Sequence, residues 1–112
     1  FGYRIQTPDK VIVISGDAGP PSTVPDQCRQ CDILIHEGGY VTPPAEQPSG
    51  YQQSFHTSAV ELAAIANRSR PRLLILSHQG PLTAEQQAER LRTIRSLYGG
   101  AVVIAQDLDV FP

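Results

Sequence analysis

The sequence segment that decides the fold is VIVISGD at residues 11–17, where four β-branched residues precede a Ser15-Gly16-Asp17 turn. A continuous apolar run is typical of a strand buried on both faces, because a half-exposed strand would alternate with polar residues. Similar runs recur at residues 32–35, 72–76 and 101–105. Residues 2–6 predict one more strand, which the turn residues at 7–10 join to the first run as a hairpin.

Helical patterns separate these predicted strands. The first covers residues 22–30, with Ser22 as N-cap and Pro25 limiting its length. The second covers residues 58–70 and ends before Pro71. The third covers residues 83–98 and begins with a Thr83-x-x-Gln86 capping box. A long segment rich in glycine and proline, residues 37–55, predicts a loop of a length that is often functional. The alternation of strand and helix predicts an α/β layered fold.

Composition excludes few functions. The 112 residues are 40% hydrophobic and carry a net charge of −2, and Lys10 is the only lysine among nine basic residues. Without a basic run, nucleic acid is possible as a partner but is not indicated. No apolar run approaches the roughly 18 residues that span a bilayer, so we expect no membrane segment. The chain begins with Phe1 rather than methionine, which we interpret as a start inside a longer protein, and its localisation stays open.

The residues that could carry chemistry follow the predicted strands. Asp17, the pair His36-Glu37 and His78 each come at a strand's carboxyl end, and His56 precedes a helix. Each also has an ordinary structural interpretation. Asp17 could be a turn residue, His36 a buried hydrogen-bonded imidazole and Glu37 a solvated loop residue. His78 could be a turn residue, and His56 could cap its helix. Because ligands in open α/β sheets bind at this edge, we expect these side chains to converge there.

The order of these motifs resembles the second half of a metallo-β-lactamase domain, and most closely the ribonuclease Z and arylsulfatase-like branch. The resemblance rests on Ser15-Gly16-Asp17, Ile35-His36-Glu37, His56-Thr57-Ser58 and Leu76-Ser77-His78. It implies that residues 1–112 form the C-terminal part of one domain, which is half of a four-layer αββα sandwich with a mixed sheet and helices on one face.

The same resemblance implies a role for each residue in a dinuclear zinc hydrolase acting on ester, phosphodiester or sulfate-ester bonds. Asp17 would bridge two zinc ions and His78 would be a terminal ligand. His56 would sit beside the site, either behind the ligands or facing the substrate, where it could contact a phosphate or assist proton transfer. Glu37, like His36, would orient its neighbours.

The chain departs from the family pattern in ways that limit this expectation. The His-x-His-x-Asp-His signature is absent, Ala18 replaces the usual threonine, and Gly38-Gly39-Tyr40 differs from the ribonuclease Z sequence. Zinc sites normally use three or four protein ligands, so we expect this chain alone to bind zinc weakly or not at all and to be inactive. The alternative is a degenerate, non-catalytic binding or assembly module.

Half a sandwich would leave one apolar sheet face uncovered. We therefore expect the missing N-terminal half, or a second copy of this chain, to bind there, because soluble monomers rarely expose apolar patches beyond a few hundred Å².

Two cysteines, Cys28 and Cys31, form a C-x-x-C motif without a second cysteine pair. Such a motif could be half of a zinc site or a redox pair. Here we expect neither, and interpret both cysteines as small residues on a short helix.

Overall fold

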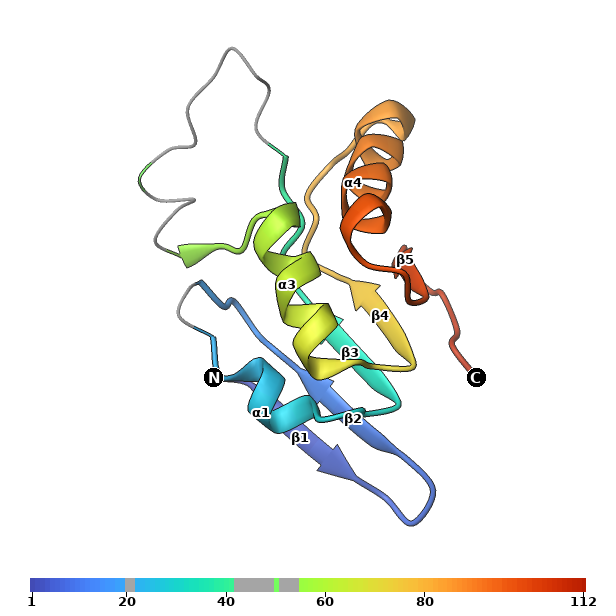
Figure 1. Ribbon diagram of the computed structural model, residues 1–112. Helices are drawn as coiled ribbons and strands as arrows, with labels where there is room; N and C mark the ends of the chain where they lie inside the picture. Colours follow the sequence, from blue (N-terminus) through green and yellow to red (C-terminus); the bar gives the residue numbers. More distant parts are fainter. Residues whose placement is uncertain (20–21, 42–49, 51–54) are drawn as a thin grey trace.

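The computed structural model describes residues 1–19, 22–41, 50 and 55–112. The long loop predicted from the sequence therefore lies mostly outside the described residues. Five strands form one sheet in the order of the chain (Figure 1). They are β1 (Tyr3–Gln6), β2 (Val11–Ile14), β3 (Ile33–His36), β4 (Leu73–Leu76) and β5 (Val102–Ile104).

The sheet is mixed. β1 pairs antiparallel to β2 as the predicted hairpin, whereas β2, β3, β4 and β5 run parallel to one another. In this register Val13, Leu34, Leu74 and Val102 form one row across the sheet. All parallel strands consequently end at the same edge, and the predicted α/β class with a mixed sheet is confirmed.

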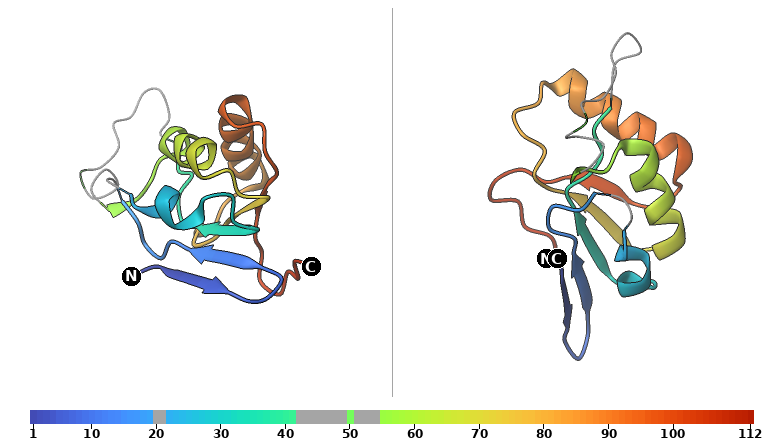
Figure 2. Two further views of the ribbon diagram at one scale, coloured as in Figure 1. Left: turned by 60° about the horizontal axis from the view of Figure 1, so that its bottom comes forward. Right: turned by 90° about the vertical axis from the view of Figure 1, so that its left-hand side faces the viewer.

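The described helices lie on one side of the sheet (Figures 1 and 2). They are α1 (Val24–Cys28), α3 (Ala59–Ser69) and α4 (Ala84–Leu97). The capping box predicted at Thr83 and Gln86 opens α4, and an equivalent box formed by Ser58 and Glu61 opens α3. The N-cap of α1 is Thr23 rather than the predicted Ser22, whose Oγ accepts from the Val24 N–H at 3.2 Å. None of the described helices is long and apolar enough to cross a membrane.

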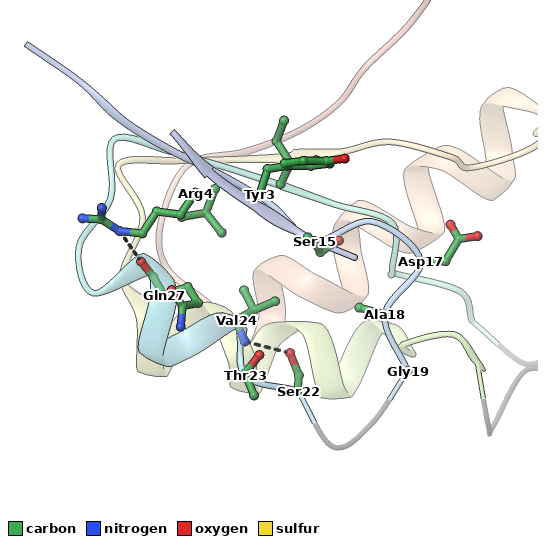
Figure 3. A pocket seen from close by; sticks show the side chains of 13 residues that line it. Tyr3, Arg4, Ser15, Asp17, Ala18, Gly19, Ser22, Thr23, Val24 and Gln27 are labelled. Carbon is green, nitrogen blue, oxygen red and sulfur yellow. Dashed lines mark hydrogen bonds between the residues drawn. The ribbon is translucent and has the colours of Figure 1, made fainter. Parts of the chain in front are cut away.

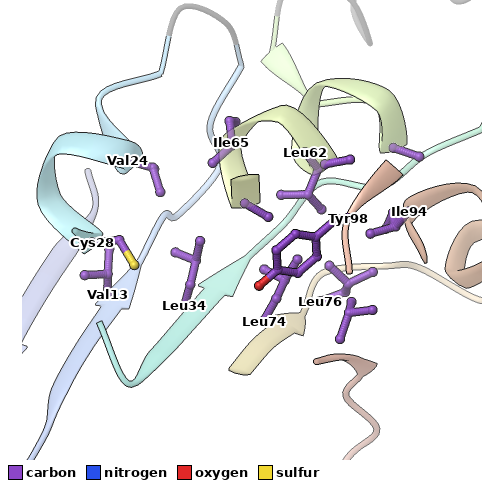
Figure 4. Packing of buried hydrophobic residues seen from close by; sticks show 14 of the residues in the cluster. Val13, Val24, Cys28, Leu34, Leu62, Ile65, Leu74, Leu76, Ile94 and Tyr98 are labelled. Atoms are coloured by element: carbon purple, nitrogen blue, oxygen red, sulfur yellow. The ribbon is translucent and has the colours of Figure 1, made fainter. Parts of the chain in front are cut away.

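The hydrophobic core lies between the sheet and these helices (Figure 4). The row of sheet residues through Leu34 and Leu74 packs against Leu62 of α3 and Ile94 of α4, and all four are fully buried. Tyr98, just after α4, is also buried and donates its hydroxyl proton to the Pro71 carbonyl oxygen at 3.2 Å. The core therefore fixes α3 and α4 against one face of the sheet.

The other face of the sheet has no helix among the described elements. Side chains alternate along a strand, so the neighbours of the buried row, among them Ile12, Ile14, Ile33 and Ile35, point to this face and are half-buried. The segment after β5 runs on this side (Figure 2). The molecule thus presents an apolar sheet surface opposite its helices.

The expectation for the C-x-x-C motif is wrong. Cys28 and Cys31 form a disulfide that joins the end of α1 to the segment entering β3. Arg29 and Gln30 between them both take left-handed backbone conformations, with φ of 34° and 65°. This tight turn brings the two Cα atoms within 4.8 Å, a distance at which a disulfide can form.

Candidate functional site

The candidate site lies where the parallel strands end. Asp17 follows β2 and His78 follows β4, and the Asp17 Oδ1 lies 3.7 Å from the His78 Nε2. Their side chains are 68% and 64% exposed, so the pair faces solvent. His78 takes a left-handed φ of 54°, a conformation that non-glycine residues adopt rarely and that clusters at functional sites. The two proposed metal ligands are therefore neighbours at one open edge.

Glu37 connects three segments beneath this pair. Its side chain is only 5% exposed, and its Oε2 lies 2.9 Å from the His56 Nδ1. Its Oε1 accepts from the backbone N–H groups of Ala18 and Thr57, each at 3.3 Å. Glu37 is therefore not a solvated loop residue, and it joins the turn after β2 to the segment that enters α3.

The Glu37 contact orients His56. A carboxylate can only accept a hydrogen bond, so the 2.9 Å contact requires the His56 Nδ1 to carry the proton. The imidazole rings of His56 and His78 are stacked, with centroids 6.2 Å apart and planes 29° apart. The structure therefore brings together Asp17, Glu37, His56 and His78, the four site residues predicted from the sequence.

His36 has a different role. It is completely buried, and its Nδ1 accepts from the Gly38 N–H at 3.1 Å. Burial lowers the pKa of His36 to about 4, so the ring is neutral at pH 7. Within the described part of the chain its Nε2 has no hydrogen-bond partner. His36 is thus a buried imidazole that shapes the loop after β3, and it does not face the open edge.

Two cavities flank the Asp17–His78 pair. The first, of about 290 Å³, is lined by Glu37, Tyr40, His56, Thr57, His78, Gln79, Gly80 and Arg90. The second, of about 450 Å³, lies between the β1–β2 hairpin and α1, and Asp17 stands at one side of it (Figure 3). The two histidines and Glu37 therefore share one pocket, whereas Asp17 lines the other cavity and contacts His78 from the turn after β2.

Sequence reasoning missed Gln79 and Arg90 in this pocket. Gln79 directly follows His78 and could have been included with it as a residue at a strand end. Arg90 lies within α4, where an arginine is ordinarily a solvated surface residue. Nothing in the sequence indicates that Arg90 faces the histidines.

The donor types fit zinc, but the number of ligands is too small. Two donors of one tetrahedral ion, each about 2.0–2.2 Å from it, lie roughly 3.4 Å apart, close to the separation of Asp17 and His78. Among the residues that the structure describes, no group of three or more His, Cys, Asp or Glu side chains could surround an ion. Asp17 and His78 can therefore contribute to a zinc site only together with further ligands.

Comparison with known proteins gives matches in sequence and in structure. No family model matches the sequence. The chain is 30% identical to ribonuclease Z of Methanosarcina mazei, over 90% of this chain and 32% of that protein. It is 27% identical to ribonuclease Z of Mycobacterium tuberculosis, over 96% of this chain and 41% of that protein. Its structure matches the metallo-β-lactamase fold protein YhfI of Bacillus subtilis with a TM-score of 0.72 and 20% identity, over 92% of this chain and 40% of that one.

These comparisons confirm the predicted fold and the ribonuclease Z part of the resemblance. The likeness to arylsulfatase-like proteins stays a prediction. The chain spans only 32% to 41% of the lengths of these relatives, so the activity of a whole protein does not follow from the match.

Proposed function

Because the chain has the metallo-β-lactamase fold and is similar in sequence to ribonuclease Z, we propose that it supplies part of the active site of a metal-dependent hydrolase. The observation that carries the proposal is the convergence of Asp17 and His78, 3.7 Å apart, beside the Glu37–His56 pair. The bonds cleaved would be ester, phosphodiester or sulfate-ester bonds.

In this proposal Asp17 and His78 are ligands of a dinuclear zinc centre. Their exposure leaves them accessible to an ion and to further ligands. Bound zinc lowers the pKa of a coordinated water and polarises the bond to be cleaved. The remaining ligands come from residues outside this chain, so the isolated chain is inactive.

His56 is the proposed catalytic group for proton transfer. With its proton on Nδ1 and bonded to Glu37, the ring keeps one tautomer and one orientation. An imidazole oriented in this way can move a proton through its Nε2, as general acid–base catalysis requires. Glu37 is the positioning residue of the pair, and its bonds to the Ala18 and Thr57 backbone fix its own place.

The apolar sheet face supports a proposal about the partner. Half-buried isoleucines from β2 and β3 point to the face opposite the helices. We infer that this face binds the half of the domain that this chain lacks, or a second copy of the chain. In a two-sheet sandwich the same contact would carry the missing zinc ligands to the edge at Asp17.

The alternative function is a non-catalytic binding or assembly module. It is favoured by the small number of metal donors among the described residues. The two candidates differ in the need for Asp17, because a binding module does not require a metal ligand at this edge.

The deciding experiment uses a longer protein that contains this chain. Zinc content and hydrolysis of bis(p-nitrophenyl) phosphate are measured for the unaltered protein, for Asp17→Ala, and for the control Asp107→Ala, which removes an exposed carboxylate after β5. We expect Asp17→Ala to lose bound zinc and most activity, and Asp107→Ala to keep both. An unaltered protein that binds no zinc and does not hydrolyse the substrate would refute the hydrolase proposal and favour the binding module. Equal zinc content and activity in all three proteins would show that Asp17 is not a metal ligand.

A further inference from the structure

Arg90 occupies an unusual position for an arginine on a surface helix. It lies in α4, is half-buried, and lines the same 290 Å³ pocket as His56 and His78. Most arginines on helices extend into solvent, since burying a guanidinium costs free energy unless its donors find partners. The position of Arg90 therefore requires an explanation.

Among the described residues, Gln79 forms a hydrogen bond with this guanidinium. The Gln79 Oε1 accepts from the Arg90 Nη1 at 2.6 Å. The Gln79 Nε2 donates to the carbonyl oxygens of Gly38 at 2.9 Å and Ser77 at 2.7 Å. Gln79 is thereby fixed by the two loops that follow β3 and β4, and it fixes Arg90 in turn.

The partner of Arg90 is a neutral amide. Within the described residues no carboxylate forms an ion pair with Arg90, and only one of its five N–H donors is used in a hydrogen bond. Burial lowers the pKa of Arg90, but an arginine stays charged at neutral pH. The pocket thus contains a fixed positive charge with donors to spare.

Glu37 does not neutralise this charge through a direct contact. It is the one carboxylate among the described residues lining the pocket. Its Oε2 contacts His56, and its Oε1 accepts from the backbone of Ala18 and Thr57. The pocket therefore combines a fixed cation with two imidazole rings, a combination that suits an anion with several acceptor oxygens.

The geometry points to Arg90, positioned by Gln79, as the residue that binds a negatively charged oxyanion group of the substrate beside His56 and His78. The inference rests on the proposed function and narrows its substrates. A phosphodiester or a sulfate ester carries a negative charge next to the bond that is cleaved, whereas a carboxylic ester is neutral. Arg90 selects the charged classes, because its fork of N–H donors matches paired acceptor oxygens.

The test measures anion binding by the 112-residue chain in the absence of metal. The ring C–H signals of His56 and His78 are followed by NMR during titration with inorganic phosphate, with sulfate, and with trimethyl phosphate, which has a phosphorus centre but no charge. The variants are Arg90→Met, Arg90→Lys and Gln79→Ala. The control is Arg92→Met, which removes an exposed arginine from the same helix outside the pocket.

We expect phosphate and sulfate to shift both histidine signals and trimethyl phosphate to shift neither. Arg90→Met should weaken phosphate binding about tenfold or more, as expected for loss of a charged hydrogen bond. Arg90→Lys should restore part of it, because a lysine keeps the charge but not the fork. Gln79→Ala should also weaken binding, and Arg92→Met should leave it unchanged. Thermal unfolding of each variant checks that the fold is intact.

Equal phosphate affinity for Arg90→Met and Arg92→Met would overturn the inference. If Arg90→Met unfolds the chain, Arg90→Lys is compared with the unaltered chain instead. Equal phosphate affinity of these two proteins would show that the paired N–H donors of the Arg90 guanidinium do not bind the anion. These outcomes are independent of zinc. Loss of phosphate binding in Arg90→Met together with an inactive, zinc-free longer protein would refute the hydrolase proposal and leave the anion site in place.

Discussion

The substitution Glu37→Gln removes the charge of a buried carboxylate and keeps the shape of its side chain. An amide oxygen can still accept from the backbone N–H groups of Ala18 and Thr57, which Glu37 binds at 3.3 Å. The amide nitrogen would then face the protonated Nδ1 of His56, 2.9 Å away in the native protein. Two donors cannot bond to each other, so His56 must move its proton to Nε2 or lose the contact.

The expected cost follows from the bond that is lost. A buried hydrogen bond to a charged group contributes about 1.5–3 kcal/mol, so Glu37→Gln should lower the free energy of unfolding by about 2 kcal/mol. Glu37→Ala also leaves two backbone N–H groups without an acceptor, and because both bonds are long we expect about 1 kcal/mol for each. The total for Glu37→Ala is then about 4 kcal/mol.

The assay combines urea unfolding with NMR of the His56 ring nitrogens. In the unaltered chain we expect the His56 proton on Nδ1, and in Glu37→Gln on Nε2. The matched control is Glu61→Gln, because a glutamine can replace glutamate in the capping box of α3. An unchanged His56 tautomer together with a stability change no larger than that of Glu61→Gln would show that the Glu37–His56 contact does not orient the ring.

Three further predictions concern stability and association. The pKa of His36 is about 4 in the folded chain and 6.5 in the unfolded chain, so the unfolded chain binds the proton first as the pH falls. The difference should therefore contribute on the order of 3 kcal/mol to the free energy of unfolding above pH 6.5, and this contribution should be lost progressively between pH 6.5 and 4. Urea unfolding across this pH range measures the loss, and the stability of a His36→Leu variant should depend less on pH. Reducing the Cys28–Cys31 disulfide should destabilise the chain by about 2 kcal/mol, which is the loop-closure value for a four-residue loop. Unfolding with and without dithiothreitol tests this prediction. Equal stability under both conditions would mean that the disulfide does not constrain the unfolded chain. The apolar sheet face should make the chain associate, and Ile33→Glu should weaken that association; a stable monomer at micromolar concentration in sedimentation would contradict the partner proposal.

Much of the fold could be predicted from the sequence because its signals are local. The apolar runs before Asp17 and His78 identify strands through residues that are adjacent in the chain. The capping box at Thr83 places the start of α4 in the same way, since its partners are three residues apart. Because parallel strands end at one edge, the predicted order of elements also placed Asp17, Glu37 and His78 at a common edge.

What the tertiary structure alone decided involves contacts between segments distant in the chain. Arg90 lines the pocket of the histidines only because α4 packs against α3 and β5, and it is fixed by Gln79, eleven residues earlier. Glu37 is buried because its oxygens accept from residues nineteen and twenty positions away. The disulfide of Cys28 depends on two successive left-handed residues, which no residue type there demands. The sequence by itself determined the strands, their ends and the polar residues that follow them, because those depend on neighbours in the chain. Partners and charges in the pocket depend on how the packed helices direct side chains, and only the folded core sets that direction.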